Sequence, residues 1–230
     1  MTVIGGVFLM VYLGCFFLWG NISIYVLSYF HETNPDVDYG FIFLVDTFLV
    51  LANCTGYQIG TFLLQKLRWH PKVILSVGCG IALTGVYLSS YTTSLGPYLA
   101  FYTGMNGLGC GMSYMVPLVC SWEYFPHKKG LITGIVVGSY GFGSFFFGLI
   151  STKLANPDNL AATIEDPENN LTFFGPEVAD RVPFMIRTLA LIWAVLVIIA
   201  ILLITRKAKS HTEEVETAVV PTRDQVETLN

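Results

Sequence analysis

The sequence predicts an all-helical membrane protein, a bundle of six transmembrane helices. Of its 230 residues, 53% are hydrophobic and only 12% are charged, and the mean hydropathy is +0.61. The apolar residues form continuous runs of about 20 residues, the length that crosses a bilayer as a helix. Continuous rather than alternating runs argue against membrane-spanning strands. A soluble enzyme or a secreted disulfide scaffold does not fit this composition, and the net charge of −4 gives no footprint for nucleic acid.

Six segments have the length and apolar character of a transmembrane helix. They are residues 3–29, 41–64, 73–91, 98–120, 131–150 and 184–205. The first is not a secretory signal, because it lacks a basic start and a small-residue cleavage site and is too long. Residues 206–230 are polar and poor in aromatic residues, so we expect a disordered cytoplasmic tail or the start of a central linker.

The basic residues predict the orientation in the bilayer. If the N-terminus is cytoplasmic, nine of the twelve lysines and arginines lie on the cytoplasmic side, as the positive-inside rule requires. These nine are Lys66, Arg68, Lys72, Lys128, Lys129, Arg206, Lys207, Lys209 and Arg223. Both termini are then cytoplasmic, in a plasma or organelle membrane. The outer loop, residues 151–183, contains Asn170 in a possible glycosylation tripeptide.

Cysteine and histidine positions predict neither a metal site nor a cofactor. The five cysteines all lie in apolar runs without metal-ligand spacing, and we expect them to be packing residues. They are Cys15, Cys54, Cys79, Cys110 and Cys120. The four histidines lie in loops or in the tail. Because the spans contain no catalytic triad or carboxylate pair, the chain is not expected to be an enzyme.

Glycines recur at helical spacing on two spans. The helix-packing candidates are Gly107 and Gly111 on the fourth span and Gly130, Gly134, Gly138 and Gly141 on the fifth. Glycine stripes let helices approach closely in lipid. The stripes fit either static packing or a sliding interface between two bundles that rock past each other.

Charged residues in and beside the spans suggest further roles. Asp46 and Arg187 lie at similar depth in the outer leaflet, so they could form an ion pair, or Asp46 could couple protons or face substrate. Lys128 and Lys129, in the short inner loop, either anchor the chain at the membrane surface or pair with helix ends or acidic groups.

Uncharged polar side chains also collect within the spans. Asn21 and Tyr25 share one face of the first span, and Asn106 and Tyr114 lie on the fourth. Each is unfavourable in hydrocarbon unless it is hydrogen-bonded or faces water. A water-accessible substrate cavity between these two helices explains them, as do hydrogen bonds between helices.

Three stretches of the chain resemble the major facilitator superfamily, and its oxalate:formate antiporter and monocarboxylate transporter branch in particular. The central stretch joins GLGCGMSYMVP of the fourth span to YFPHKKGLITGIVVGSYGFG of the fifth. The others are LGCFFLWGNISIYVLSYF and the loop TFLLQKLRWHPK. In the superfamily this loop usually reads Gly-x-x-x-Asp-Arg-x-Gly-Arg-Arg. Thr61, Gln65, Lys66 and Arg68 occupy its first glycine, aspartate, arginine and second glycine positions, so the usual acidic residue is absent.

The resemblance implies a secondary transporter of small carboxylates that works by alternating access. It implies a substrate cavity at Asn21, Tyr25, Asn106 and Tyr114, and gating loops at Gln65, Lys66, Lys128 and Lys129. Family members have twelve spans, so the partners implied are the bilayer, a small organic anion and a second six-helix half. That half would be part of the same gene product or a second copy of this chain. The alternative is a non-transporting six-span protein with a regulatory or receptor-like role.

Overall fold

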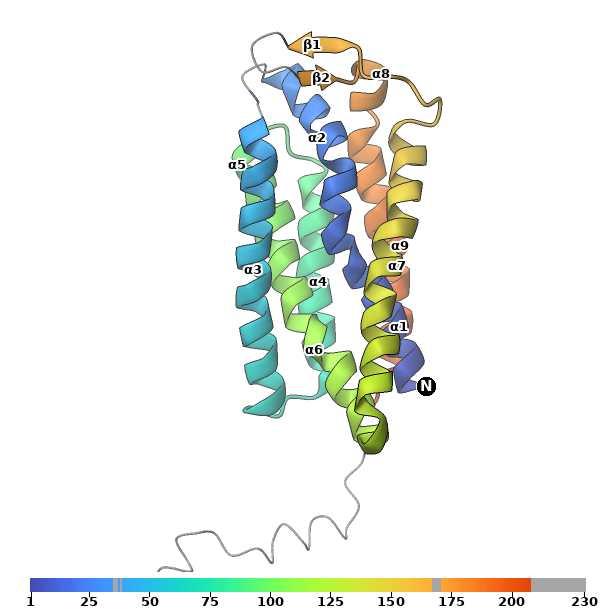
Figure 1. The fold of residues 1–230 in the computed structure, drawn as a ribbon. Coiled ribbons are helices and arrows are strands. Elements are labelled where there is room, and N and C mark those ends of the chain that lie inside the picture. The colour runs from blue at the N-terminus through green and yellow to red at the C-terminus, as the bar shows by residue number, and fades with distance from the viewer. Residues whose placement is uncertain (35–36, 38, 167–170, 208–230) are drawn as a thin grey trace, which may run out of the picture.

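The computed structural model describes residues 1–34, 37, 39–166 and 171–207. Within these residues, six long helical segments run side by side (Figure 1). In chain order they are α1–η1–α2 (Thr2–Leu13, Gly14–Leu18 and Trp19–Thr33), α3 (Tyr39–Gln65), α4 (Pro71–Ser89), α5–η2–α6 (Leu95–Tyr98, Leu99–Met105 and Asn106–Tyr124), α7 (Lys129–Ala155) and α9 (Val182–Leu203). A 3-10 turn, η3 (Pro126–Lys128), joins α6 to α7, and the short α8 (Pro176–Ala179) precedes α9.

Five of the six segments are long and apolar enough to cross a membrane. The segment that ends in α6 has similar length and the same alignment in the bundle (Figure 1), but its glycine and polar residues lower its mean hydropathy. This segment continues from α5 as a π-helix over Leu99–Met105 and contains Pro117 inside α6. It is buried mainly because it packs along both α3 and α4.

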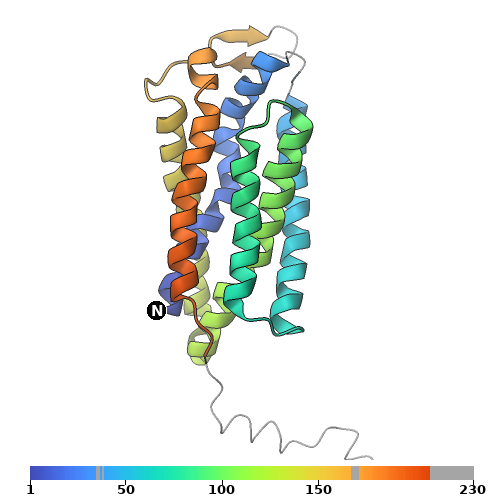
Figure 2. The same cartoon turned by 180° about the vertical axis from the view of Figure 1, so that it is seen from behind.

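The helices lie in two layers. Figure 1 views the face on which α3, α6 and α7 lie in front, and Figure 2 views the opposite face, formed by α4 and α9. We call these the front face and the back face. The segment α1–η1–α2 packs against α6, α7 and α9, and its side chains form much of the core. There the Trp193 ring of α9 lies 6.1 Å from the Tyr12 ring and 5.5 Å from the Phe147 ring.

Glycines allow α3 and α6 to touch through their backbones. A Cβ at Gly111 would overlap the carbonyl oxygen of Asn53, and one at Gly107 would lie 2.7 Å from the carbonyl oxygen of Leu49. Gly56 and Gly60 of α3 make reciprocal contacts with the α6 backbone. Because even a methyl group would force the two helices apart, this interface depends on glycine at these positions.

The α7 stripe differs from the expectation of helix packing. A Cβ at Gly130, Gly134, Gly138 or Gly141 would meet no described atom within 4 Å. The neighbouring glycine on the other side of the helix, Gly143, is in close contact, because its Cβ would overlap the carbonyl oxygen of Val11. Helix α7 therefore packs on α1 through Gly143 and turns its predicted stripe outward.

The segment between α7 and α8 contains a small hairpin where the sequence predicted only a loop. Strands β1 (Ile164–Asp166) and β2 (Leu171–Phe173) pair antiparallel, with Ile164 opposite Phe173. The ring of Phe173 stacks on His31 at 4.0 Å, and the Phe174 amide donates a hydrogen bond to Ser28 Oγ at 3.0 Å. The hairpin therefore sits on the C-terminal end of α2. Asn170 lies outside the described residues.

Candidate functional site

Four aromatic rings form a continuous row across the front face. Tyr57 of α3 lies 6.0 Å from Tyr114 of α6, and Tyr114 lies 5.8 Å from Tyr140 of α7 in an edge-to-face contact. Tyr140 then lies 5.1 Å from Phe17 of η1. We call Tyr57, Tyr114, Tyr140 and Phe17 the tyrosine row. Because its members come from four helical segments, only the tertiary structure brings them together.

The tyrosine row is available to bind a polar ligand within the membrane. The three tyrosines are half-buried and Phe17 is 55% exposed. Each residue lies about two helical turns or more from the ends of its segment. Within the described part of the chain, the Tyr57, Tyr114 and Tyr140 hydroxyls make no hydrogen bond to another residue. A tyrosine hydroxyl can donate a hydrogen bond to a carboxylate oxygen, so the row can supply three donors beside an aromatic surface.

The open glycine stripe of α7 adjoins the tyrosine row. Gly138 and Gly141 flank Tyr140 in sequence and, with Phe142 and Phe145, line a shallow cavity of about 450 Å³. The side chains of Phe142 and Phe145 are 64% and 62% exposed. This part of the front face therefore presents a smooth apolar surface beside the polar hydroxyls.

The four predicted cavity residues do not converge. Only Tyr114 belongs to the tyrosine row. Tyr25 is 8% exposed and stacks on Phe174 at 5.0 Å beneath the hairpin. Asn106 is 3% exposed, and its Oδ1 accepts a hydrogen bond from the Cys110 thiol at 3.3 Å. Asn21 is exposed and faces Gly148 of α7, where a Cβ would lie 3.2 Å from its Nδ2.

Sequence reasoning missed Tyr57, Tyr140 and Phe17. One signal was present, since Tyr140 interrupts the glycine stripe between Gly138 and Gly141. If the glycine stripe of α7 is not covered by other helices of the chain, Tyr140 next to it is accessible as well. No comparable signal marks Phe17, which is one of many phenylalanines in apolar runs.

The predicted Asp46–Arg187 ion pair is not formed. Asp46 is exposed on α3, whereas Arg187 Nε donates a hydrogen bond to the carbonyl oxygen of Pro183 at 3.1 Å. The Arg187 guanidinium lies over the Tyr91 ring, 5.2 Å from its centroid. Arg187 therefore belongs to a back-face contact between α9 and the end of α4, and Asp46 makes no salt bridge to any described residue.

The lysines that join α6 to α7 are also unpaired in the described part of the chain. Lys128, at the end of η3, and Lys129, at the start of α7, are both exposed and form no salt bridge there. Among the described residues near this end, Glu123 is the acidic group that is bonded: its Oε1 accepts from Arg206 Nε at 2.9 Å and its Oε2 accepts from the Lys207 amide at 3.3 Å. Sequence reasoning predicted a role for Lys128 and Lys129 and did not predict the Glu123 contacts, which connect the end of α6 to the segment after α9.

The same end of the bundle holds a polar network around Thr205. Its hydroxyl lies 3.1 Å from Thr2 Oγ1 and 3.0 Å from the Tyr124 hydroxyl. The start of α1, the end of α6 and the segment after α9 thus meet at one point. Gln65 and Lys66, the other predicted gating residues, are exposed at the end of α3 and in the loop that follows it.

The chain is similar in sequence to several proteins that are named as transporters or carriers. It is 25% identical to apicoplast pyruvate carrier 1 of Toxoplasma gondii over 242 aligned positions, which cover 86% of this chain and 44% of the carrier. It is 23% identical to the MFS-type transporter YhjX of Escherichia coli, with 71% of this chain and 39% of the relative covered. It is 30% identical to monocarboxylate transporter 12 of Xenopus laevis, with 61% and 31% covered. No family model matches the chain.

The relatives agree with the expected fold class and with the expectation that the chain is not an enzyme. They are named as transporters or carriers, and the chain spans less than half of their length. The helical bundle, its five strongly apolar helices and these relatives identify an integral, multi-pass membrane protein with the half-bundle fold. The chain is a homologue of the transporters of the major facilitator superfamily, related to its monocarboxylate, pyruvate and oxalate carriers.

Proposed function

We propose that the chain supplies one six-helix half of a secondary transporter for small carboxylates, with the tyrosine row as its part of the substrate site. The observation that carries this proposal is the row itself: three half-buried tyrosines from three helices, in ring contact, without hydroxyl partners among the described residues. The relatives, which include a protein named as a pyruvate carrier and one named as an oxalate:formate antiporter, support a carboxylate as substrate.

A second six-helix half would cover the front face. The outward glycines of α7 and the exposed Phe142 and Phe145 offer a smooth apolar surface for such a partner. Small residues allow helices to approach closely and to slide past each other, as alternating access requires. The tyrosine row contains no lysine or arginine. In this proposal the second half therefore supplies the positive charge that holds the carboxylate. That half is part of the same gene product or a second copy of the chain.

Both termini are proposed to face the cytoplasm. One end of the bundle carries Lys66, Arg68, Lys72, Lys128, Lys129, Arg206 and Lys207, and the other carries Lys153, Arg181 and Arg187. This distribution supports the orientation by the positive-inside rule. The orientation is tested with Lys153→Cys. A membrane-impermeant thiol reagent, added outside intact cells, should label this variant.

The first experiment identifies the native product and then measures uptake. An immunoblot of native membranes with an antibody to residues 151–183 gives the mass of the native product. A band near 25.4 kDa corresponds to this chain alone, and a band near twice that mass corresponds to a product with a second half. The protein of the observed mass is then expressed in a host that lacks carboxylate uptake. Labelled pyruvate, formate and oxalate are then supplied. We expect Tyr114→Phe and Tyr140→Phe to slow uptake of at least one of them by about tenfold, the loss of one hydrogen bond to a charged group.

The matched control is Tyr87→Phe, which removes a tyrosine hydroxyl from the exposed end of α4 on the back face. It should leave uptake unchanged at equal membrane expression. Unchanged uptake in both row variants would contradict the assignment of the row. Absence of uptake of any of the three anions, together with capture of a partner protein that Tyr114→Phe abolishes, would favour the regulatory alternative.

A further inference from the structure

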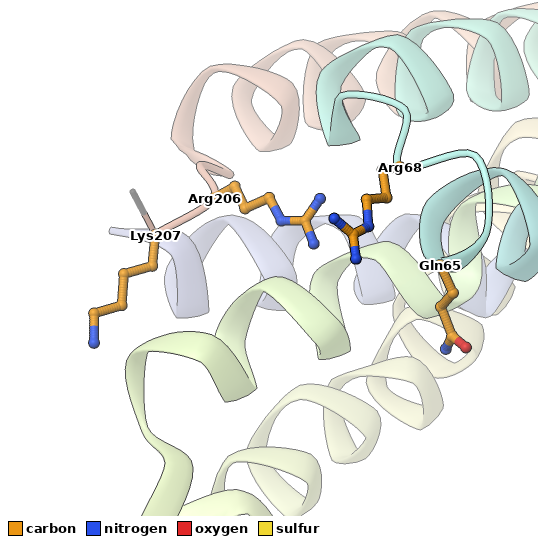
Figure 3. Close-up of a pocket in the computed structure, with 4 residues that line it drawn as sticks. All are labelled: Gln65, Arg68, Arg206 and Lys207. Atoms are coloured by element: carbon orange, nitrogen blue, oxygen red, sulfur yellow. The ribbon is translucent and has the colours of Figure 1, made fainter. Parts of the chain in front are cut away.

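A cleft at the end of the bundle where α1 begins and α9 ends is lined by three cations. Gln65, Arg68, Arg206 and Lys207 surround a space of about 520 Å³ between the α3–α4 loop and the segment after α9. This volume is within the range of small-molecule sites, about 300–1,000 Å³. Figure 3 shows the Arg68 and Arg206 guanidinium groups pointing toward one another across the cleft, with Gln65 and Lys207 at its two edges. Two guanidinium groups in this arrangement repel unless an anion lies between them.

The charges of the cleft are only partly balanced by the described residues. Glu123 accepts a hydrogen bond from Arg206 Nε at 2.9 Å, and the other two nitrogens of that guanidinium have no hydrogen-bond partner among the described residues. Arg68 forms no salt bridge within the described residues. After the Glu123–Arg206 pair is counted, no described acidic residue forms a salt bridge with Arg68 or Lys207, so two positive charges on one cleft remain unbalanced within the described part of the chain.

The backbone at Arg68 is an independent sign of a functional cation. Arg68 has φ of +52°, in the left-handed region that favours glycine and costs other residues about 1–2 kcal/mol. It also occupies the position where the superfamily loop has its second glycine. The chain thus places a large cation where glycine would be less strained. Non-glycine residues in this region are concentrated at ligand-binding and active sites.

Among the described residues, the cleft is lined by the neutral Gln65 and by no carboxylate. Gln65 occupies the position of the usual aspartate in this loop, and it lines the same cleft as Arg68. A carboxylate at this position would be an internal partner for the two arginines. Since glutamine carries no charge, an external anion can take that place.

We propose that this cleft binds a phosphate-bearing anion, held between the guanidinium forks of Arg68 and Arg206. Arginine matches the geometry of phosphate with paired N–H donors. Trp69, next to Arg68, is 44% exposed, and exposed tryptophans favour the headgroup layer of a bilayer. The headgroup of an acidic phospholipid is therefore within reach, and a soluble phosphate would offer the same chemistry.

The test uses the full 230-residue chain, purified in an uncharged detergent, and three probes: dioctanoyl phosphatidylglycerol, dioctanoyl phosphatidylcholine and inorganic phosphate. Affinity is measured by native mass spectrometry and by thermal shift. We expect phosphatidylglycerol to bind, and Arg68→Gly and Gln65→Asp each to weaken binding at least about tenfold, the effect of losing one charge-assisted contact. Gln65→Asp keeps every cation, so its effect would come from the internal carboxylate that displaces the ligand.

The matched control is Lys129→Gln, which removes one positive charge from the same end of the bundle without touching the cleft. It should change the affinity by less than about twofold. Arg68→Gly should fold, because glycine accepts a φ of +52°, and Gln65→Asp gives a second test if it does not. Inorganic phosphate binding as tightly as phosphatidylglycerol would support the site with a soluble source. Failure of both anions to bind, equal binding of phosphatidylcholine, or equal losses in Arg68→Gly and Lys129→Gln would overturn the proposal.

Discussion

The α3–α6 interface and the outward side of α7 use similar glycine spacing for opposite purposes. Between α3 and α6 the glycines lie in backbone contact, so that a methyl group at Gly111 would overlap Asn53. On α7, a Cβ added at any of the stripe glycines, from Gly130 to Gly141, would meet no described atom within 4 Å. A glycine stripe thus marks a surface suited to close approach, but whether that surface is occupied within the same chain depends on the rotation of the helix.

The largest expected effect is that of Gly111→Ala. The new methyl group would overlap the Asn53 carbonyl oxygen and approach the Tyr57 amide nitrogen to 2.7 Å, so α3 and α6 must separate. We expect a loss of about 3 kcal/mol of unfolding free energy, measured as a lowered midpoint of thermal unfolding in detergent. Gly80→Ala on α4 is the control, because its Cβ would meet no described atom within 4 Å. Equal midpoints for the two variants would contradict the interface.

Gly143→Ala tests the comparison within α7 itself. Its Cβ would overlap the carbonyl oxygen of Val11 on α1, so this variant should resemble Gly111→Ala and not its neighbours in the open stripe. We expect a loss of about 2 kcal/mol in the same unfolding measurement. A midpoint equal to that of the unmodified chain would show that α7 does not pack on α1 through this glycine.

Gly138→Ala should have the reverse sign. Its Cβ would extend into open space, and alanine has a higher helix propensity than glycine, so a gain of up to about 1 kcal/mol is expected. If a second half docks on this surface, the same substitution should reduce transport despite the higher stability. Unchanged uptake at equal expression would indicate that the stripe is not an interface between moving halves.

Glu123→Gln should give the smallest effect on stability. The Glu123 and Arg206 side chains are 27% and 38% exposed, and ion pairs this close to water contribute about 0–1 kcal/mol. We expect a loss of about 0.5 kcal/mol, smaller at high salt, in thermal unfolding at two ionic strengths. A loss as large as that of Gly143→Ala would show that the polar contact, and not glycine packing, holds the ends of the helices.

Sequence reasoning succeeded where a single helix was sufficient evidence. The apolar runs predicted the helical membrane fold, and the stretch from Gly104 to Phe145 indicated the transporter relatives. The role of Tyr114 as a substrate residue stays a prediction, and the structure places this residue in the tyrosine row. Tyr25 and Asn106 were selected by the same argument, yet Tyr25 lies beneath Phe174 and Asn106 bonds Cys110 inside the bundle. Polarity within a span showed that a partner was needed, without showing which partner.

The sequence by itself determined that this chain is a helical membrane protein, because in hydrocarbon every backbone N–H and C=O must be paired within the segment that crosses it. Only the tertiary structure decided which glycines are closed and which tyrosines share one surface. A helix that is apolar on all sides carries no strong amphipathic signal of its orientation. Its rotation is therefore set by contacts with its neighbours, such as Gly143 against Val11, and these contacts bring Tyr57, Tyr114 and Tyr140 together.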